Sequence, residues 1–224
     1  WNEKNMRYAM CAFPLIGVVI GGLWCLCGAL PLPMPAKAAG FCLIPVWVTG
    51  GIHLDGYADT CDALSSYGDR EKKLEILKDS RVGAFAVVSA VLLFLLSFAA
   101  LADCSFSLIW RALLLIPVVT RCMAGVAVET FAPMQTSQYA GSFAAGKTKT
   151  QRRILLGMYI AVMFVVFLWL FSKPSCALAV AWAGLTTILA CRLARRNLGG
   201  MSGDIAGFSI TLGELSGLLI LAIF

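Results

Sequence analysis

Long apolar runs dominate this sequence and leave few folds open to it. Each run is close to the roughly 20 residues that an α-helix needs to cross a bilayer. Apolar residues make up 60% of the 224 positions and charged residues only 13%, whereas soluble domains carry about 25% charged residues. A water-soluble domain is therefore excluded, and we expect an all-α, polytopic integral membrane protein that forms one helical bundle over residues 1–224. The seven expected spans are 9–30, 36–54, 82–102, 107–128, 154–172, 174–191 and 207–224.

The second span contains the strongest helix breakers. Pro45, Gly50 and Gly51 interrupt its apolar run. Such residues are tolerated in membrane helices where neighbouring helices satisfy the freed backbone groups. We therefore expect this span to bend or break before His53.

Basic residues alternate between the two ends of the expected bundle. Because lysine and arginine gather in cytoplasmic connections, the pattern predicts a cytoplasmic N-terminus and an external C-terminus. Topology thus explains the net charge of +6, and no nucleic-acid partner is expected. The basic segments are Lys4 with Arg7, the stretch from Arg70 to Arg81, the run from Lys147 to Arg153, and Arg192 with Arg195 and Arg196.

Acidic residues concentrate just after the second span. Asp55, Asp59 and Asp62 stand at i, i+4 and i+7, so on a helix they lie within about 60° of one another on one face. Three neighbouring carboxylates repel one another and are stable as anions only with a cation among them. Mg²⁺ suits such a site, because it completes its shell with water and substrate phosphate. A solvated acidic face or helix N-caps are the alternative, although capping would account for one aspartate only.

Further polar residues border other spans. Gly56 would let a substrate phosphate approach the acidic helix, and Asp79 with Arg81 is either a metal ligand with a phosphate clamp or a cap with a topological charge. Asp204 stands at the start of the last span. Glu214 lies deep inside that span, where an acid costs about 2.5 to 3.5 kcal/mol, so we expect it to face the bundle interior and bond to a partner. That partner could be Arg121, Arg111, a hydroxyl or substrate; Arg121 together with Glu129 is otherwise most simply a topological charge.

These motifs together resemble the cobalamin synthase family, the adenosylcobinamide-GDP ribazoletransferases. The likeness rests on TGGIHLDGYADTCDAL, ILKDSRVGAF and GGMSGDIAGFSITLGELSGLL, and it extends from Phe13 to the end of the chain. It implies a Mg²⁺-dependent enzyme of the cell inner membrane, acting late in vitamin B12 synthesis with its active-site loops in the cytoplasm. In that reaction a hydroxyl of α-ribazole, or of its 5'-phosphate, attacks the phosphate attached to cobinamide in adenosylcobinamide-GDP and expels GMP. The sequence departs from the family pattern at Ala63, where glycine is commoner, and in FAPMQTSQYAGSFAAGK, which lacks the usual arginines and acids.

The resemblance also implies roles for individual residues. Metal binding falls on Asp55, Asp59, Asp62 and Asp79. Substrate binding falls on Gly56, Ser80, Arg81, Gly203, Asp204 and Glu214. Asp62 or His53 would accept the proton of the attacking hydroxyl, and Arg81 would stabilise the developing charge.

Three other functions compete with this hypothesis. The DG-x-x-A-D block is similar to the core motif of CDP-alcohol phosphotransferases, which use an aspartate-bound metal to attack a pyrophosphate. An ion-coupled transporter would use Glu214 and the aspartates as a cation path, but it predicts acids spread over several helices rather than crowded in one segment. A non-catalytic membrane subunit gives no reason for the three aspartates. The sequence does not indicate an oligomeric state.

Overall fold

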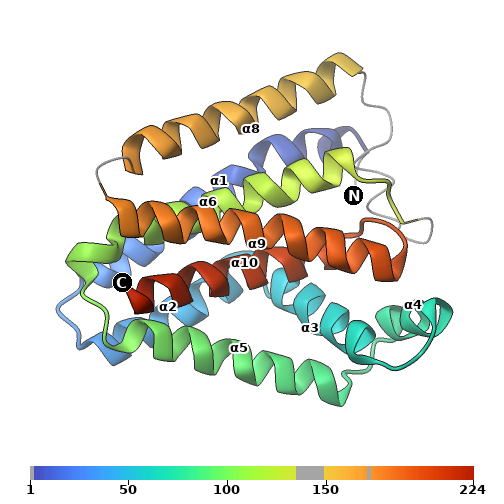
Figure 1. Cartoon of the computed structure of the whole chain (residues 1–224), viewed down its shortest axis with the longest axis horizontal. Coiled ribbons are helices and arrows are strands. Elements are labelled where there is room, and N and C mark those ends of the chain that lie inside the picture. The colour runs from blue at the N-terminus through green and yellow to red at the C-terminus, as the bar shows by residue number, and fades with distance from the viewer. Residues whose placement is uncertain (1–2, 135–148, 171–172) are drawn as a thin grey trace.

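The computed structural model describes residues 3–134, 149–170 and 173–224, and these ranges are almost entirely helical (Figure 1). Within them the sole β-type pairing is an isolated parallel bridge between Pro133 and Met201, which confirms the all-α fold. Lys147, one of the predicted topological charges, lies outside the described residues. The helices are α1 (Glu3–Ala29), α2 (Met34–Thr49), α3 (Ile52–Ser65), α4 (Arg70–Lys78), α5 (Ala84–Ala102), α6 (Phe106–Thr130), α8 (Lys149–Leu170), α9 (Pro174–Leu198) and α10 (Gly203–Ile223).

Most of these helices coincide with the expected membrane spans. In the described part of the chain, α1, α5, α6, α9 and α10 are long and apolar enough to cross a membrane. Helices α2 and α3 together make a sixth span if the bent pair is counted as one. The remaining expected span, 154–172, falls on α8, some of whose side chains lie outside the described residues. A polytopic membrane protein is thus confirmed, and the count of seven crossings stays a prediction.

The predicted break before His53 is present. Gly50 and Gly51 have φ values of 62° and 82°, in the left-handed region that glycine enters without steric cost. Gly50 ends α2 as its C-cap, and α3 leaves at 97° to α2. Because of this turn, α3 packs against α5 and α10 instead of continuing the line of α2.

Helix α10 lies at the centre of the bundle and packs against α9, α3, α6 and α5 (Figure 1). Small residues allow the close approach: a Cβ added at Gly217 would already lie 3.0 Å from the Cβ of Ala183 on α9. Such small-residue contacts are typical of helices packed within a membrane. On α5, by contrast, Val87, Val91 and Leu95 are exposed, as expected for a helix that faces lipid.

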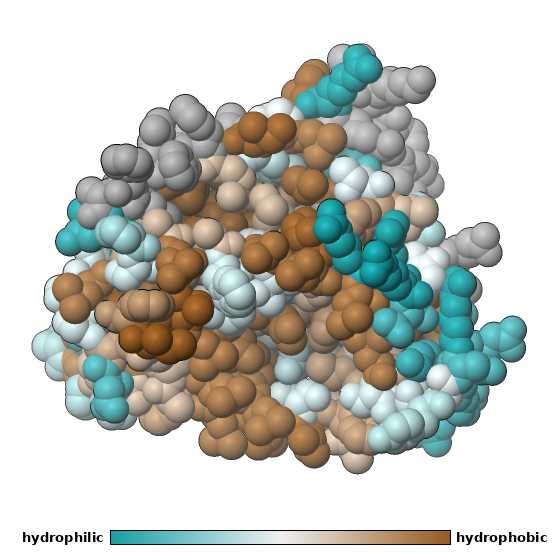
Figure 2. All heavy atoms as spheres, viewed as in Figure 1, coloured by the Kyte–Doolittle hydropathy of each residue, from teal (hydrophilic) through white to brown (hydrophobic). Residues whose placement is uncertain are grey.

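The two ends of the bundle differ in polarity. Figure 2 shows hydrophilic residues gathered at the end that carries α4, whereas apolar residues cover most of the middle. Helix α1 begins at the α4 end, and α10 finishes at the opposite end (Figure 1). An odd number of crossings requires this arrangement, so it agrees with the predicted topology.

Candidate active site

Helix α3 carries the three aspartates predicted to lie together. Asp55, Asp59 and Asp62 all fall within this unbroken helix, so the expected helical spacing is confirmed. Asp55 is exposed, while Asp59 and Asp62 are partly buried. Asp59 is close enough to both of the others for their charges to repel its own. The acidic residues therefore form one continuous stripe on α3.

A fourth carboxylate joins the stripe from α10. Asp204 stands in the first turn of α10, close enough to Asp59 to repel its charge and close enough to Asp55 to be repelled by it. The close approach of α10 to α3 depends on Gly56, because a Cβ there would lie 2.8 Å from both the Cα and the carbonyl oxygen of Asp204. The space beside Gly56, where we expected a substrate phosphate, is thus occupied by α10. We call Asp55, Asp59, Asp62 and Asp204 the carboxylate cluster.

The local chain fixes where Asp204 lies. Gly199 ends α9 in the left-handed region, with φ of 84°. The backbone of Met201 then accepts a hydrogen bond from the Met134 amide (2.9 Å) and donates one to the Ala132 carbonyl (2.9 Å). Ser202 caps α10 by accepting a bond from the Ile205 amide at 3.2 Å. These contacts hold residues 199–204 (GGMSGD) against the end of α6. They thereby place the first turn of α10 next to α3.

The carboxylate cluster has no basic partner in the described part of the chain. The ion pairs there involve Glu75, Asp79 and Glu214 instead. Four neighbouring anions without a cation repel one another, most strongly at the partly buried Asp59. This charge imbalance is what a bound divalent cation would remove.

A closed metal cage is absent from the described residues: no group of three His, Cys, Asp or Glu side chains there could hold a metal ion as it stands. Mg²⁺ does not require such a cage, since it usually keeps several waters and binds one or two carboxylates together with substrate phosphates. The donors present are aspartate oxygens, which are the ligands that Mg²⁺ prefers. The carboxylate cluster therefore fits an open Mg²⁺ site that substrate would complete.

Asp62 lies against the connection between α4 and α5. A side chain at Gly83 would collide with both carboxylate oxygens of Asp62. The connection therefore passes directly beside the carboxylate cluster. This places Asp79, Ser80 and Arg81, which we call the DSR motif, near the site.

Within the DSR motif, Asp79 and Arg81 form a bidentate ion pair. Arg81 donates from Nη2 to Asp79 Oδ2 at 2.7 Å and from Nε to Oδ1 at 3.0 Å, and both side chains are solvent-accessible. Hydrogen bonds from Arg81 lower the pKa of Asp79 from 3.8 to about 2, so Asp79 is ionised at neutral pH. Ser80 is exposed. Among the described residues no hydrogen bond or ion pair joins Asp79 to the carboxylate cluster, so its role as a metal ligand stays a prediction that requires this pair to open.

A second polar group lies inside the bundle. Glu214 is buried, as predicted, and its partner is Arg121, whose Nη1 donates to Glu214 Oε1 at 2.6 Å. Arg121 also bonds the Pro117 carbonyl through Nη1 (3.0 Å) and His53 Nδ1 through Nη2 (3.3 Å). The interpretation of Arg121 as a topological charge was wrong, because its side chain is fully buried and paired.

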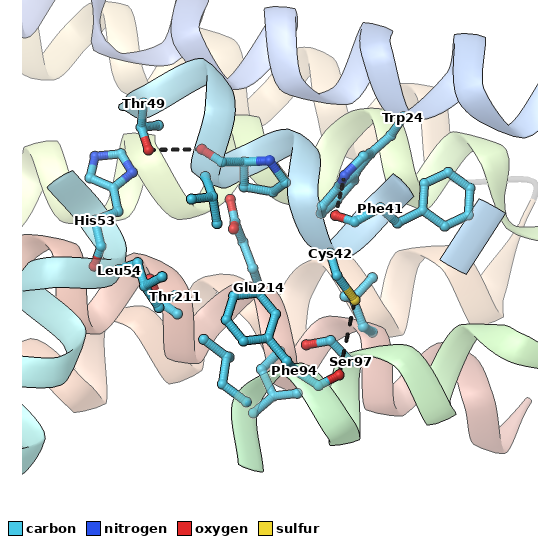
Figure 3. Close-up of a pocket in the computed structure, with 15 residues that line it drawn as sticks. Trp24, Phe41, Cys42, Thr49, His53, Leu54, Phe94, Ser97, Thr211 and Glu214 are labelled. Atoms are coloured by element: carbon cyan, nitrogen blue, oxygen red, sulfur yellow. Dashed lines mark hydrogen bonds between the residues drawn. The ribbon is translucent and has the colours of Figure 1, made fainter. Parts of the chain in front are cut away.

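A small cavity opens beside this pair. His53 and Glu214 line it, and its volume is about 60 Å³ (Figure 3). Apolar side chains such as Trp24, Phe41 and Leu218 form most of the remaining wall. The cavity has room for a few water-sized groups next to the buried ion pair.

Two features of the site had no signal in the sequence. Nothing in the spacing indicated that Asp204 would meet Asp59, because the two stand on helices far apart in the chain. Arg121 was one of the partners considered for Glu214, but its second bond, to His53, was not expected. The glycines offer the one hint that sequence could have used, since Gly56 and Gly207 both mark close contacts between α3 and α10.

Comparison with known proteins identifies relatives along the whole chain. The family model for cobalamin-5-phosphate synthase matches residues 1–222. An adenosylcobinamide-GDP ribazoletransferase from Clostridium perfringens is 36% identical, and the match covers 100% of this chain and 90% of the relative. Those from Lachnoclostridium phytofermentans (37% identical; 96% and 83% covered) and Halalkalibacterium halodurans (36%; 96% and 85%) are similarly related. No solved structure matches the chain. The full-length match and the level of identity show that this chain belongs to the cobalamin-5-phosphate synthase family.

Proposed function

We propose that the protein is an adenosylcobinamide-GDP ribazoletransferase of the cell inner membrane. It joins adenosylcobinamide-GDP to α-ribazole, or to α-ribazole 5'-phosphate, and yields adenosylcobalamin, or its 5'-phosphate, with GMP. The observation that carries this proposal is the carboxylate cluster formed by α3 and α10 in a chain whose full-length relatives bear that name.

The carboxylate cluster suits displacement at a pyrophosphate, which depends on positioning and charge neutralisation. One or two carboxylates of the set Asp55, Asp59, Asp62 and Asp204 would hold each Mg²⁺, and Asp79 would become available as a further ligand once it leaves Arg81. When bound, Mg²⁺ supplies positive charge to the bridging oxygens of the substrate diphosphate. Arg81, freed in the same rearrangement, can hold phosphate oxygens with its two-pronged guanidinium.

The first turn of α10 offers an approach for substrate. No atom lies within 4 Å of the position that a Cβ would take at Gly203, and this residue is exposed. The backbone amides of a helix start attract anions. Gly203 and Ser80 therefore remain the residues that we assign to substrate phosphate, in place of the enclosed Gly56.

Geometry favours Asp62 over His53 as the acceptor of the hydroxyl proton. A guanidinium has donors only, so His53 Nδ1 must accept the bond from Arg121 and its ring proton stays on Nε2. The ring is thus held as a donor. As the hydroxyl oxygen of α-ribazole bonds to phosphorus, its proton passes to the Asp62 carboxylate, and the bond between phosphorus and the GMP oxygen breaks.

The alternatives gain no support. A transporter needs Glu214 as a free ion site, yet its carboxylate is bound by Arg121, and the four acids of the carboxylate cluster lie together rather than along a path. A CDP-alcohol phosphotransferase is not supported either, because the family model that matches the chain is that of cobalamin-5-phosphate synthase.

The orientation of the protein in the membrane is inferred from the basic residues at the end of the bundle that carries α4. Helix α4, which packs against α3, carries Arg70, Lys72, Lys73 and Lys78. Arg70 donates to the Gly199 carbonyl at the end of α9 (3.3 Å). Arg195 and Arg196 lie in the last turn of α9. By the positive-inside rule this end faces the cytoplasm, where nucleotide substrates are found.

The test is turnover by the purified protein in detergent. We expect GMP and the cobalamin product when adenosylcobinamide-GDP, Mg²⁺ and either form of α-ribazole are present, and neither after EDTA treatment. Comparing the two ribosides shows which one is the substrate. Folded protein that releases no GMP with either riboside would refute the proposal.

A further inference from the structure

The proposed reaction does not use Arg121 directly, although burying its charge is costly. Glu214 lies ten residues beyond Asp204 on α10, which is about 15 Å along a helix. Arg121 is fully buried, and an arginine in that setting is retained only with well-placed partners. Its partners stand on the two helices that form the carboxylate cluster, which suggests a mechanical role.

Helix α10 presents one stripe of residues to α3. Asp204, Gly207, Thr211 and Glu214 are spaced at i, i+3, i+7 and i+10, so they share a face. Asp204 contacts Gly56, and a Cβ at Gly207 would lie 3.0 Å from the His53 carbonyl oxygen. The Thr211 hydroxyl donates to that same carbonyl at 3.4 Å. These contacts fix the position of α10 along α3 from Asp204, in the carboxylate cluster, to Thr211, deeper in the bundle.

Arg121 binds Glu214, the residue of this stripe that lies deepest in the bundle. From α6 it donates Nη1 to Glu214 on α10 and Nη2 to His53 on α3, and Nη1 is also anchored to the Pro117 carbonyl of its own helix. The planar guanidinium holds these directions rigidly. A sliding or rotation of α3 relative to α10 would break at least one of these bonds.

We propose that Arg121 is a positioning residue that sets the register of α3 against α10 and so the arrangement of Asp55, Asp59 and Asp204. The inference rests on the proposed function, because it concerns the same site. It assigns Glu214 the task of holding Arg121, in contrast to direct contact with substrate.

The test compares single and double substitutions of the buried pair. Arg121→Met and Glu214→Gln each leave one buried group without its partner, and each should lower kcat roughly tenfold or more while KM for both substrates stays near the wild-type value. The double variant Arg121→Met/Glu214→Gln leaves no unpaired carboxylate. It should be more stable to heat than Arg121→Met alone, but it still lacks the bridge between α3 and α10, so its kcat should stay as low as that of Arg121→Met.

A second measurement is independent of turnover. Mn²⁺ binding without substrates, followed by electron paramagnetic resonance, should weaken in Arg121→Met and stay weak in the double variant, and recovery in the double variant would overturn the role in register. Should Arg121→Met fail to fold, Arg121→Lys keeps the charge but loses the planar fork, and weaker Mn²⁺ binding is again expected. Wild-type Mn²⁺ affinity and kcat in the folded single variant would overturn the proposal.

The exposed pair Lys72–Glu75 on α4, at 2.8 Å, is the matched control. Its side chains are 56% and 70% exposed, so the variants Lys72→Met and Glu75→Gln and their combination should show no measurable coupling. If Glu214 contacts substrate instead, Glu214→Gln raises KM while Mn²⁺ binding without substrates stays at the wild-type level. If wild-type protein releases no GMP, the proposed function fails, whereas the thermal and Mn²⁺ comparisons still decide the role of Arg121.

Discussion

Replacing Gly56 with alanine tests the contact that brings α10 to the acidic stripe of α3. The new Cβ would lie 2.8 Å from the Asp204 backbone, about 0.6 Å short of the 3.4 Å at which ordinary contact begins. The obstacle is backbone on both sides of the contact, so no side chain can rotate away and the helices must separate. Overpacking of this kind costs about 1–3 kcal/mol, and the better helix propensity of alanine offsets about 1 kcal/mol.

Gly22→Ala on α1 is the matched control. Gly22 also stands inside a helix, but no atom lies within 4 Å of its Cβ position. Both variants gain the same helix propensity, so the difference between their stabilities isolates the overpacking. We expect Gly56→Ala to be about 1–3 kcal/mol less stable than Gly22→Ala in unfolding followed by tryptophan fluorescence.

The same displacement should reduce turnover. Misplacement of a catalytic group by about 1 Å can cost a factor of about 100, so we expect GMP release by Gly56→Ala to fall roughly 10- to 100-fold and that by Gly22→Ala to stay unchanged. Full activity and full stability in Gly56→Ala would show that α3 and α10 do not meet at Asp204 as described.

Other substitutions probe the carboxylate cluster and its neighbours. Asp59→Asn should abolish GMP release yet leave thermal stability unchanged or higher, since it removes repulsion; turnover by the purified variant in Mg²⁺ would refute this. Gly83→Ala should slow turnover by displacing the Asp62 carboxylate, and an unchanged kcat would count against Asp62 as proton acceptor. Because the folded pKa of Asp79 is lowered to about 2, its pairing with Arg81 stabilises the fold above pH 3.8 and is lost as the pH falls through 2. In metal-free protein, Arg81→Ala should raise that pKa toward 3.8 in an NMR titration of labelled aspartate, and an unmoved pKa would contradict the ion pair.

Much of the fold could be predicted because the bilayer imposes strict rules on the sequence. Apolar length alone located the spans within a few residues in most cases. The helix breakers Pro45, Gly50 and Gly51 located the break before α3, where both glycines have positive φ. What could not be predicted was which helices pack together, since lipid-facing and buried apolar surfaces look alike in sequence.

In the site, too, some features could be predicted from the sequence and others depend on how the helices pack. Helical periodicity placed Asp55, Asp59 and Asp62 on one stripe, and the cost of a buried acid placed Glu214 inside the bundle. The contribution of Asp204 and the partner of Glu214 depend on packing between distant segments, for which one sequence carries no direct signal. Gly56 was predicted to allow a close approach to the acidic helix, but the group that approaches is α10 rather than a substrate phosphate.

If α3 and α10 together hold the divalent cation, the ion must lie between these two helices. Anomalous diffraction from crystals of the protein with Mn²⁺ and GMP would give its position. We expect an anomalous peak within bonding distance of Asp55 or Asp59 on α3 and next to Asp204 on α10. A peak elsewhere, with these carboxylates turned toward solvent, would contradict it.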